Sequence, residues 1–107
     1  MILLKTKIKN LNLLLKEAVT LGHLLFSEHS LLRLKERKIL KTEVEFILKN
    51  GFHEKRKDKF NEKFNDWDYS IRGRTLDGRT LRVIIAVIKP NIFVVTAIEL
   101  NEKKDKN

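Results

Sequence analysis

A histidine and two arginines recur at intervals of four residues between positions 29 and 37. His29, Arg33 and Arg37 would share one stripe of an α-helix, because residues four apart lie on the same helical face. An imidazole changes charge near neutral pH, and a guanidinium binds a phosphate through two parallel hydrogen bonds. The spacing therefore indicates a site that holds a phosphate and moves a proton beside it, with an ordinary solvated face as the alternative.

Four more arginines stand on either side of a turn predicted at Asp77-Gly78: Arg72, Arg74, Arg79 and Arg82. Residues 67–72 alternate between apolar and polar types, which predicts a half-buried strand with Arg72 on its polar face. Arg82 begins an otherwise apolar strand, where a guanidinium without a counter-charge is costly to bury. We expect these arginines to be paired or to bind phosphate; the alternative is charge that protects an edge strand.

Two further features could belong to the same site. Thr96 lies in the apolar run 92–98, where its hydroxyl needs a partner unless it is an ordinary strand residue. Residues 55–63 read KRKDKFNEK, and the cations Lys55, Arg56 and Lys57 could follow a nucleic-acid backbone. The alternative for this run is a solvated hairpin.

The elements that would position these residues are helices followed by strands. An amphipathic helix is predicted within residues 1–22, with its stripe from Leu4 and Ile8 onward and its end near Gly22; residues 2–8 could instead begin as a strand. Ser27 is a good N-cap for a second helix, which carries the stripe. A capping box at residues 42–45 would open a third helix, and Asn50-Gly51 would close it in a left-handed cap.

The second half of the chain changes to the period of strands. Residues 81–88 and 92–98 are nearly continuous apolar runs and are predicted to be central strands covered on both faces. The pattern predicts an α+β domain with N-terminal helices packed on a three- to four-stranded antiparallel sheet. Its expected parts are an N-terminal helical extension (1–22), an α+β domain (23–100) and a charged tail (101–107).

Composition narrows the classes of function. The 107 residues include 23 Lys and Arg against 14 Asp and Glu, a net charge of +9 that favours an anionic partner. RNA, DNA, an acidic protein or an anionic membrane could use this charge. There is no cysteine and no ligand-spaced histidine pair, so neither a metal site nor a cofactor is expected. No run approaches the ~20 apolar residues of a membrane span, so the expectation is a cytoplasmic protein that does not bind membranes.

Taken in order, these motifs resemble a known family. The order is Phe-Ser-x-His-x-x-x-Arg-x-x-x-Arg-x-Ile, a short helix ending in Asn-Gly, then Gly-Arg-x-x-x-Gly-Arg-x-Leu-x-Val and Val-Thr-Ala. It resembles the small domains grouped with the RelE-like toxins in the barnase–EndoU–colicin–RelE ribonuclease fold, over residues 25–100. The resemblance rests on Ser27, His29, Arg33, Arg37, Ile39, Gly51, Gly73, Arg74, Gly78, Arg79, Leu81, Val95 and Thr96.

The resemblance implies a metal-independent endoribonuclease with its active face on the sheet. His29 would exchange the proton, Arg33 and Arg74 would stabilise the phosphorane, and Thr96 would orient an arginine or the phosphate. Arg37, Lys55, Arg56, Lys57, Arg72, Arg79 and Arg82 would bind the nucleic acid. The implied partners are RNA and an acidic or zinc-ribbon antitoxin.

The chain also departs from that family. It adds residues 1–22 and a longer basic insert at 52–66, and it ends Ile98-Glu99-Leu100 without a counterpart of the C-terminal catalytic tyrosine or histidine of RelE. Two other hypotheses therefore stand beside the ribonuclease. One is a nucleic-acid-binding module without catalysis. The other is a protein-interaction domain, with a homodimer formed through the N-terminal helix.

Overall fold

Three helices and a mixed six-stranded sheet form the computed structural model, which describes residues 4–100. The helices are α1 (Leu11–Leu21), α2 (Glu28–Glu36) and α3 (Lys41–Asn50), and a 3-10 turn, η1, spans Lys55–Lys57. The strands are β1 (Leu24–Phe26), β2 (Phe52–His53), β3 (Lys59–Asn61), β4 (Asp66–Arg74), β5 (Thr80–Ile88) and β6 (Asn91–Leu100). The α+β class expected from the sequence is confirmed. The expected charged tail at 101–107 lies outside the described residues.

The sheet is larger than the sequence predicted, and it is not all antiparallel. Its order is β1-β6-β5-β4-β2, with β3 also paired to β4, and β1 runs parallel to β6. The expectation of three or four antiparallel strands is therefore wrong. It holds for β4, β5 and β6, which pair as antiparallel neighbours. The missed strands have two or three residues each, too few to show the alternation by which a strand is recognised.

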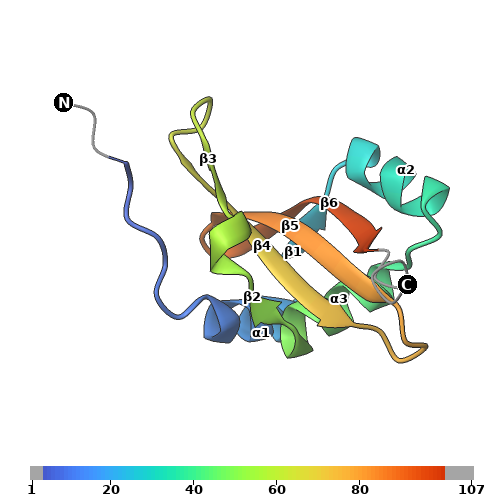
Figure 1. Ribbon diagram of the computed structural model, residues 1–107. Helices are drawn as coiled ribbons and strands as arrows, with labels where there is room; N and C mark the ends of the chain where they lie inside the picture. The colour runs from blue at the N-terminus through green and yellow to red at the C-terminus, as the bar shows by residue number, and fades with distance from the viewer. Residues whose placement is uncertain (1–3, 101–107) are drawn as a thin grey trace, which may run out of the picture.

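One face of the sheet is covered by α1 and α3, as Figure 1 shows. Side chains alternate between the faces of a strand, so Tyr69 and Ile71 of β4 face the helices together with Val83 of β5. These residues are at most 1% exposed, as are Leu15 of α1 and Val44 of α3. The α1 helix is therefore part of the same core as the sheet.

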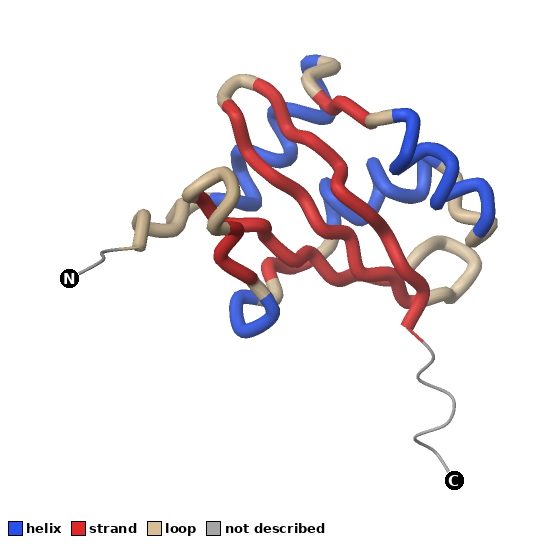
Figure 2. The backbone as a smooth tube through the Cα atoms, turned by 90° about the horizontal axis from the view of Figure 1, so that it is seen from above, coloured by secondary structure: helices blue, strands red, loops and turns tan. Residues whose placement is uncertain are grey.

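The other face of the sheet is open, and α2 lies beside it rather than over it (Figure 2). The prediction that the two apolar strands are covered on both faces is wrong. On β5, Ile84 and Ala86 point to the open face and are partly exposed, whereas Val83 and Ile85 are fully buried. We call this surface the open face. It is bordered by α2 next to β6 and by the segment from β2 to β3 next to β4.

The end of α1 and the start of α2 follow local capping rules, whereas the start of α3 differs from its prediction. The Ser27 hydroxyl accepts a 3.0 Å hydrogen bond from the Ser30 amide, which confirms it as the N-cap of α2. Gly22 ends α1 at a φ of 77°, in the left-handed conformation. The predicted start of α3 at Thr42 is wrong, because Glu43 accepts instead from the amide of Leu40, at 2.9 Å.

Gly51 ends α3 for a steric reason and not a conformational one. Its φ of −80° is open to any residue, so the predicted left-handed cap is wrong. A Cβ at this position would stand 2.6 Å from the carbonyl oxygen of Arg72 and 2.7 Å from that of Ile47. The glycine lets the end of α3 pack directly against the backbone of β4.

Residues 4–10, which precede α1, form neither a helix nor a strand. Leu4 and Ile8, expected in the helical stripe, precede Leu11, where the helix begins. The carbonyl of Lys5 accepts a 2.6 Å hydrogen bond from the Trp67 indole, and the Ile8 amide donates to the Tyr69 hydroxyl at 3.0 Å. These contacts to β4 replace the first helical turns.

We expect Gly51→Ala to lower the free energy of unfolding by about 1–3 kcal/mol, because two backbone carbonyls must move to accept the methyl group. Urea denaturation measures the loss. Lys49→Ala, at an exposed position in the last turn of the same helix, is the control and should stay within about 0.5 kcal/mol of the wild type. Equal stability of the two variants would contradict the close approach of α3 and β4.

Candidate functional site

Two of the three residues of the stripe on α2, His29 and Arg33, are exposed. His29 and Arg33 make no side-chain hydrogen bond or ion pair with any residue between 4 and 100. The helix is fixed from the other side, where Ser30 and Leu34 are 1% and 2% exposed. The stripe therefore presents an imidazole and a guanidinium to solvent on a firmly packed helix.

Arg37, the third residue of the stripe, is bound to β6. Its Nη1 donates to the Thr96 hydroxyl at 2.8 Å and to the Ala97 carbonyl at 2.9 Å. Thr96 pairs with Ile84, so it lies on the open face. The hydroxyl predicted to need a partner has one, and the stripe runs beside the open face. The contact also fixes the end of α2, so Arg37 has a structural role there.

Arg72 and Arg82 lie side by side on the open face and share one carboxylate. They are register partners on β4 and β5, and Glu54, which follows β2, accepts from both. The Arg82 contacts are 2.8 and 3.1 Å, and the Arg72 contact is 3.2 Å. The Ser70 hydroxyl adds a longer bond of 3.3 Å. The sequence left open whether Arg82 is paired or functional, and the structure shows that it is paired with Glu54.

Glu54 is 5% exposed and carries its charge because of these partners. The hydrogen bond from Arg82, followed by that from Arg72, lowers the pKa of its carboxyl from 4.5 to about 2, against the opposing effect of burial. Sequence reasoning missed this residue. Its one signal was an acidic residue next to a basic run, and such a residue is usually solvated.

Arg79 is also paired with carboxylates. It forms an ion pair with Glu43 of α3, contacts Asp77 at 3.3 Å and Glu99 at 3.6 Å, and donates to the Lys38 carbonyl at 3.2 Å. The Glu43 carboxylate, more than any other group, raises the pKa of the guanidinium. Arg79 thus fixes the five-residue loop between β4 and β5, which is longer than the tight turn expected at Asp77-Gly78.

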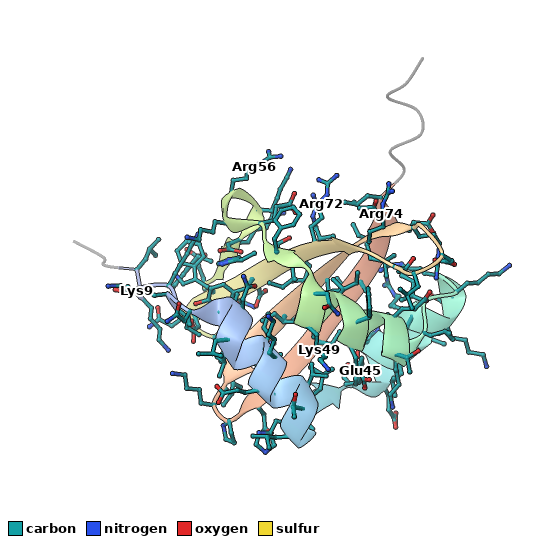
Figure 3. All side chains as sticks on the ribbon, turned by 90° about the horizontal axis from the view of Figure 1, so that it is seen from below. Lys9, Glu45, Lys49, Arg56, Arg72 and Arg74 are labelled. Carbon is teal, nitrogen blue, oxygen red and sulfur yellow. The ribbon has the colours of Figure 1, made fainter. Side chains whose placement is uncertain are left out.

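The remaining cations predicted to bind nucleic acid are exposed and available to a ligand. Arg74, Arg56 and Lys57 are exposed, and their side chains have no bonded partner among residues 4–100. Figure 3 shows Arg56, Arg72 and Arg74 along one edge of the molecule, from η1 and β4. Lys55 is also exposed, and its carbonyl accepts from Lys7. We call this edge, with Phe52 of the neighbouring β2, the β4 edge.

A second buried carboxylate holds the segment that carries these cations. The Asp58 side chain is fully buried; it accepts from the Ser70 amide at 2.9 Å and contacts the His53 ring at 2.7 Å and the Lys7 ammonium at 3.1 Å. The run predicted as a solvated hairpin or a nucleic-acid track is therefore anchored to β4. Its lysine and arginine side chains point outward from a fixed backbone.

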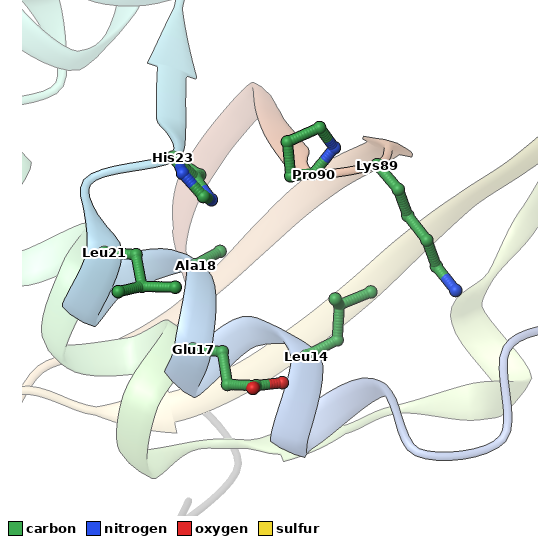
Figure 4. A pocket seen from close by; sticks show the side chains of 7 residues that line it. All are labelled: Leu14, Glu17, Ala18, Leu21, His23, Lys89 and Pro90. Carbon is green, nitrogen blue, oxygen red and sulfur yellow. The ribbon is translucent and has the colours of Figure 1, made fainter.

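A hollow lies away from every predicted site residue. It has a volume of about 450 Å³ and lies between α1 and the β5–β6 turn (Figure 4). Its lining is Leu14, Glu17, Ala18, Leu21, His23, Lys89 and Pro90. Among residues 4–100, no group of three or more His, Asp or Glu side chains is arranged to hold a metal ion.

The chain belongs to a family whose activity is not established. Residues 26–99 match the domain of unknown function DUF4258. No curated protein matches the chain. No solved structure matches it either. The matched region runs from the end of β1 to β6 and leaves out α1, although Leu11, Leu15 and Ala18 of α1 lie in the core. No helix in the described part of the chain is long and apolar enough to cross a membrane.

The Glu54 carboxylate should make stability depend on acid. Its pKa is about 2 in the fold and near 4.5 when unfolded, so its contribution is complete above pH 4.5 and is lost as the pH falls toward 2. This difference corresponds to about 3 kcal/mol. In Glu54→Gln we expect lower stability at pH 7 and a flatter stability profile between pH 4.5 and 2, measured by urea denaturation at each pH.

Glu45→Gln is the matched control, because Glu45 has no bonded partner among residues 4–100. Its profile should follow that of the wild type. If Glu54→Gln and Glu45→Gln give the same profile, the two arginines do not depend on Glu54.

Proposed function

We propose that this chain is a metal-independent endoribonuclease of the toxin kind, with RNA bound on the open face and cleaved beside α2. One observation supports this most directly. His29 and Arg33 are exposed and have no side-chain partner among residues 4–100, and the third member of their stripe, Arg37, is bound to Thr96 of the open face. An imidazole next to a free guanidinium fits the cleavage of a phosphodiester with no metal ion.

The chemistry assigned to these residues balances without a further reactant. The 2′-hydroxyl of one nucleotide attacks the adjacent phosphorus, the bond from phosphorus to the 5′-oxygen breaks, and a 2′,3′-cyclic phosphate and a 5′-hydroxyl remain. His29 removes the proton from the 2′-hydroxyl, and the leaving oxygen takes a proton from His29 or water. Arg33 stabilises the extra negative charge on the phosphorane, which is worth about 3–4 kcal/mol for a well-placed donor.

Thr96 and Arg74 hold different places in this proposal. Thr96 acts through Arg37, which it holds at 2.8 Å, so it is a positioning residue. Arg74 is on β4, two strands from β6, or roughly 10 Å at the usual strand spacing. It is therefore assigned to binding a neighbouring phosphate of the same RNA chain.

Binding of RNA without cleavage is the second candidate, and a specific observation favours it. His29 has no carboxylate or carbonyl partner among residues 4–100 that would orient its ring. The exposed cations on the β4 edge need no such arrangement, because phosphate contacts depend on charge alone. The assay below separates the two candidates.

The proposal includes a partner and a location. An acidic antitoxin, or a zinc-ribbon one, would cover the open face, and the protein would act in the cytoplasm. A homodimer through α1 would use Leu13 and Leu21, which are 59% and 65% exposed, because the opposite side of α1 is buried in the core. A neighbouring gene for a small acidic or zinc-ribbon protein would support the antitoxin.

We expect His29→Ala to slow RNA cleavage at least 100-fold, which is the usual contribution of an acid–base group. Arg33→Ala should slow it by a similar factor, through loss of charge stabilisation. Lys35→Ala, which removes an exposed cation from another side of the same helix, is the control and should keep full activity. End analysis of the products should find 2′,3′-cyclic phosphate. Equal rates for the wild type and the three variants would refute the catalytic roles of His29 and Arg33.

Binding is tested by its dependence on salt. Each phosphate contact contributes about 0.7 to the slope of log affinity against log salt on a single strand, so Arg74→Ala should reduce the slope by about that amount. Lys49→Ala on the helix-covered side removes the same charge and should leave the slope unchanged. A wild type that neither binds nor cuts any RNA tested refutes both candidates.

A further inference from the structure

An exposed aromatic ring stands among the cations of the β4 edge. Phe52 of β2 is 55% exposed, although it lies in the sheet between a helix and a buried residue. Its register partner on β4 is Arg72, and paired residues of antiparallel strands point to the same face. Arg72 contacts Glu54 on the open face, so Phe52 is on that face too.

The neighbouring residue shows that this exposure is not a general property of β2. His53 points to the other face, where its ring meets Tyr69 edge-on at 5.5 Å and its side chain is 6% exposed. The strand therefore buries one aromatic ring and leaves more than half of the other exposed. The exposed part of the Phe52 ring contributes nothing to the stability of the fold, because only buried apolar surface is stabilising.

The charged residues around Phe52 indicate what kind of ligand its exposed ring could bind. Arg72 is beside it on β4, Arg74 is two residues further along the same face, and Arg56 follows in η1. Figure 3 shows these three arginines along the same edge of the molecule. A ligand for this surface must carry negative charge together with a flat apolar group, and a nucleotide of a single strand carries both.

We propose that Phe52 is a stacking platform for an unpaired base of single-stranded RNA, with the phosphates on either side held by the arginines of the β4 edge. This inference rests on the proposed binding of RNA and adds that the RNA is single-stranded. Bases in a duplex are stacked on one another and unavailable to the ring, so the platform selects single strands.

A second exposed aromatic residue provides a matched control. Phe64, in the turn between β3 and β4, is 69% exposed, and the Lys63 ammonium lies 5.5 Å from the centre of its ring. No arginine is its register partner, and it lies outside the paired strands. Phe64→Leu therefore removes a phenyl ring that is at least as exposed as that of Phe52 from a different place.

The experiment measures binding of a fluorescein-labelled 12-nucleotide RNA without secondary structure, by anisotropy, for wild type, Phe52→Leu, Phe52→Trp and Phe64→Leu. His29→Ala is included in all four proteins so that cleavage does not interfere. Stacking predicts about tenfold weaker binding for Phe52→Leu, which keeps the apolar character but loses the aromatic face. Phe52→Trp should bind as well as the wild type or better, and Phe64→Leu should match the wild type.

Further measurements distinguish the loss of stacking from a disrupted fold or from a loss of phosphate binding by the arginines. Inorganic polyphosphate has no bases, so wild type and Phe52→Leu should bind it equally. A duplex of the same sequence should bind both equally and more weakly than the single strand binds the wild type. The RNA should also quench the added indole of Phe52→Trp beyond any change of the wild-type Trp67 signal.

The outcomes separate the inference from the proposed function. Single-stranded RNA that binds Phe52→Leu as tightly as wild type overturns the platform and leaves RNA binding intact. Loss of polyphosphate binding in Phe52→Leu also overturns it, because the ring would then support the arginines and not a base. A wild type that binds no RNA overturns the proposed function and this inference together.

Discussion

The shared carboxylate of Glu54 is the contact on which the uncovered half of the sheet depends. Arg82 is on β5, in the middle of the sheet, where a guanidinium without a counter-charge would be unfavourable. Glu54 supplies that charge and at the same time binds Arg72 and Ser70 of β4. One side chain therefore connects three strands and holds the start of η1 against the open face, where a sheet of this kind is usually solvated.

This arrangement divides the positive charge of the chain into two groups. One group is held by protein groups and holds segments together: Arg37, Arg72, Arg79 and Arg82. Arg33, Arg56 and Arg74 are exposed without such partners in the described residues. The net charge of +9 therefore overstates the positive charge that is available to bind a ligand. The exposed arginines nevertheless lie on a backbone that the paired arginines hold in place. Ordering them for a ligand therefore costs little backbone entropy.

Local patterns predicted the parts of the fold that depend on neighbours in sequence. The Ser27 cap, the Gly22 end of α1 and the polar face of β4 all follow from spacing within a few residues. Glu54 and Asp58 could not be found in this way, since Glu54 is bound by Arg82, 28 residues away, and Asp58 by the amide of Ser70, 12 residues away. Gly51 was misread because glycine after a helix usually signals a left-handed turn, whereas here it allows two backbones to approach.

The surfaces proposed for RNA binding and for cleavage lie on opposite sides of the open face, and this separation limits how an RNA could use both. The β4 edge and the α2 stripe are separated by β5 and β6, and the span from β4 to β6 alone is about 10 Å. The strip between them is partly exposed and apolar, with Ile84 and Ala86 on β5. An RNA strand that used both surfaces would therefore cross the strands instead of following one of them. A duplex is too wide and too stiff to lie flat against this strip while its bases reach Phe52, and an extended single strand is not.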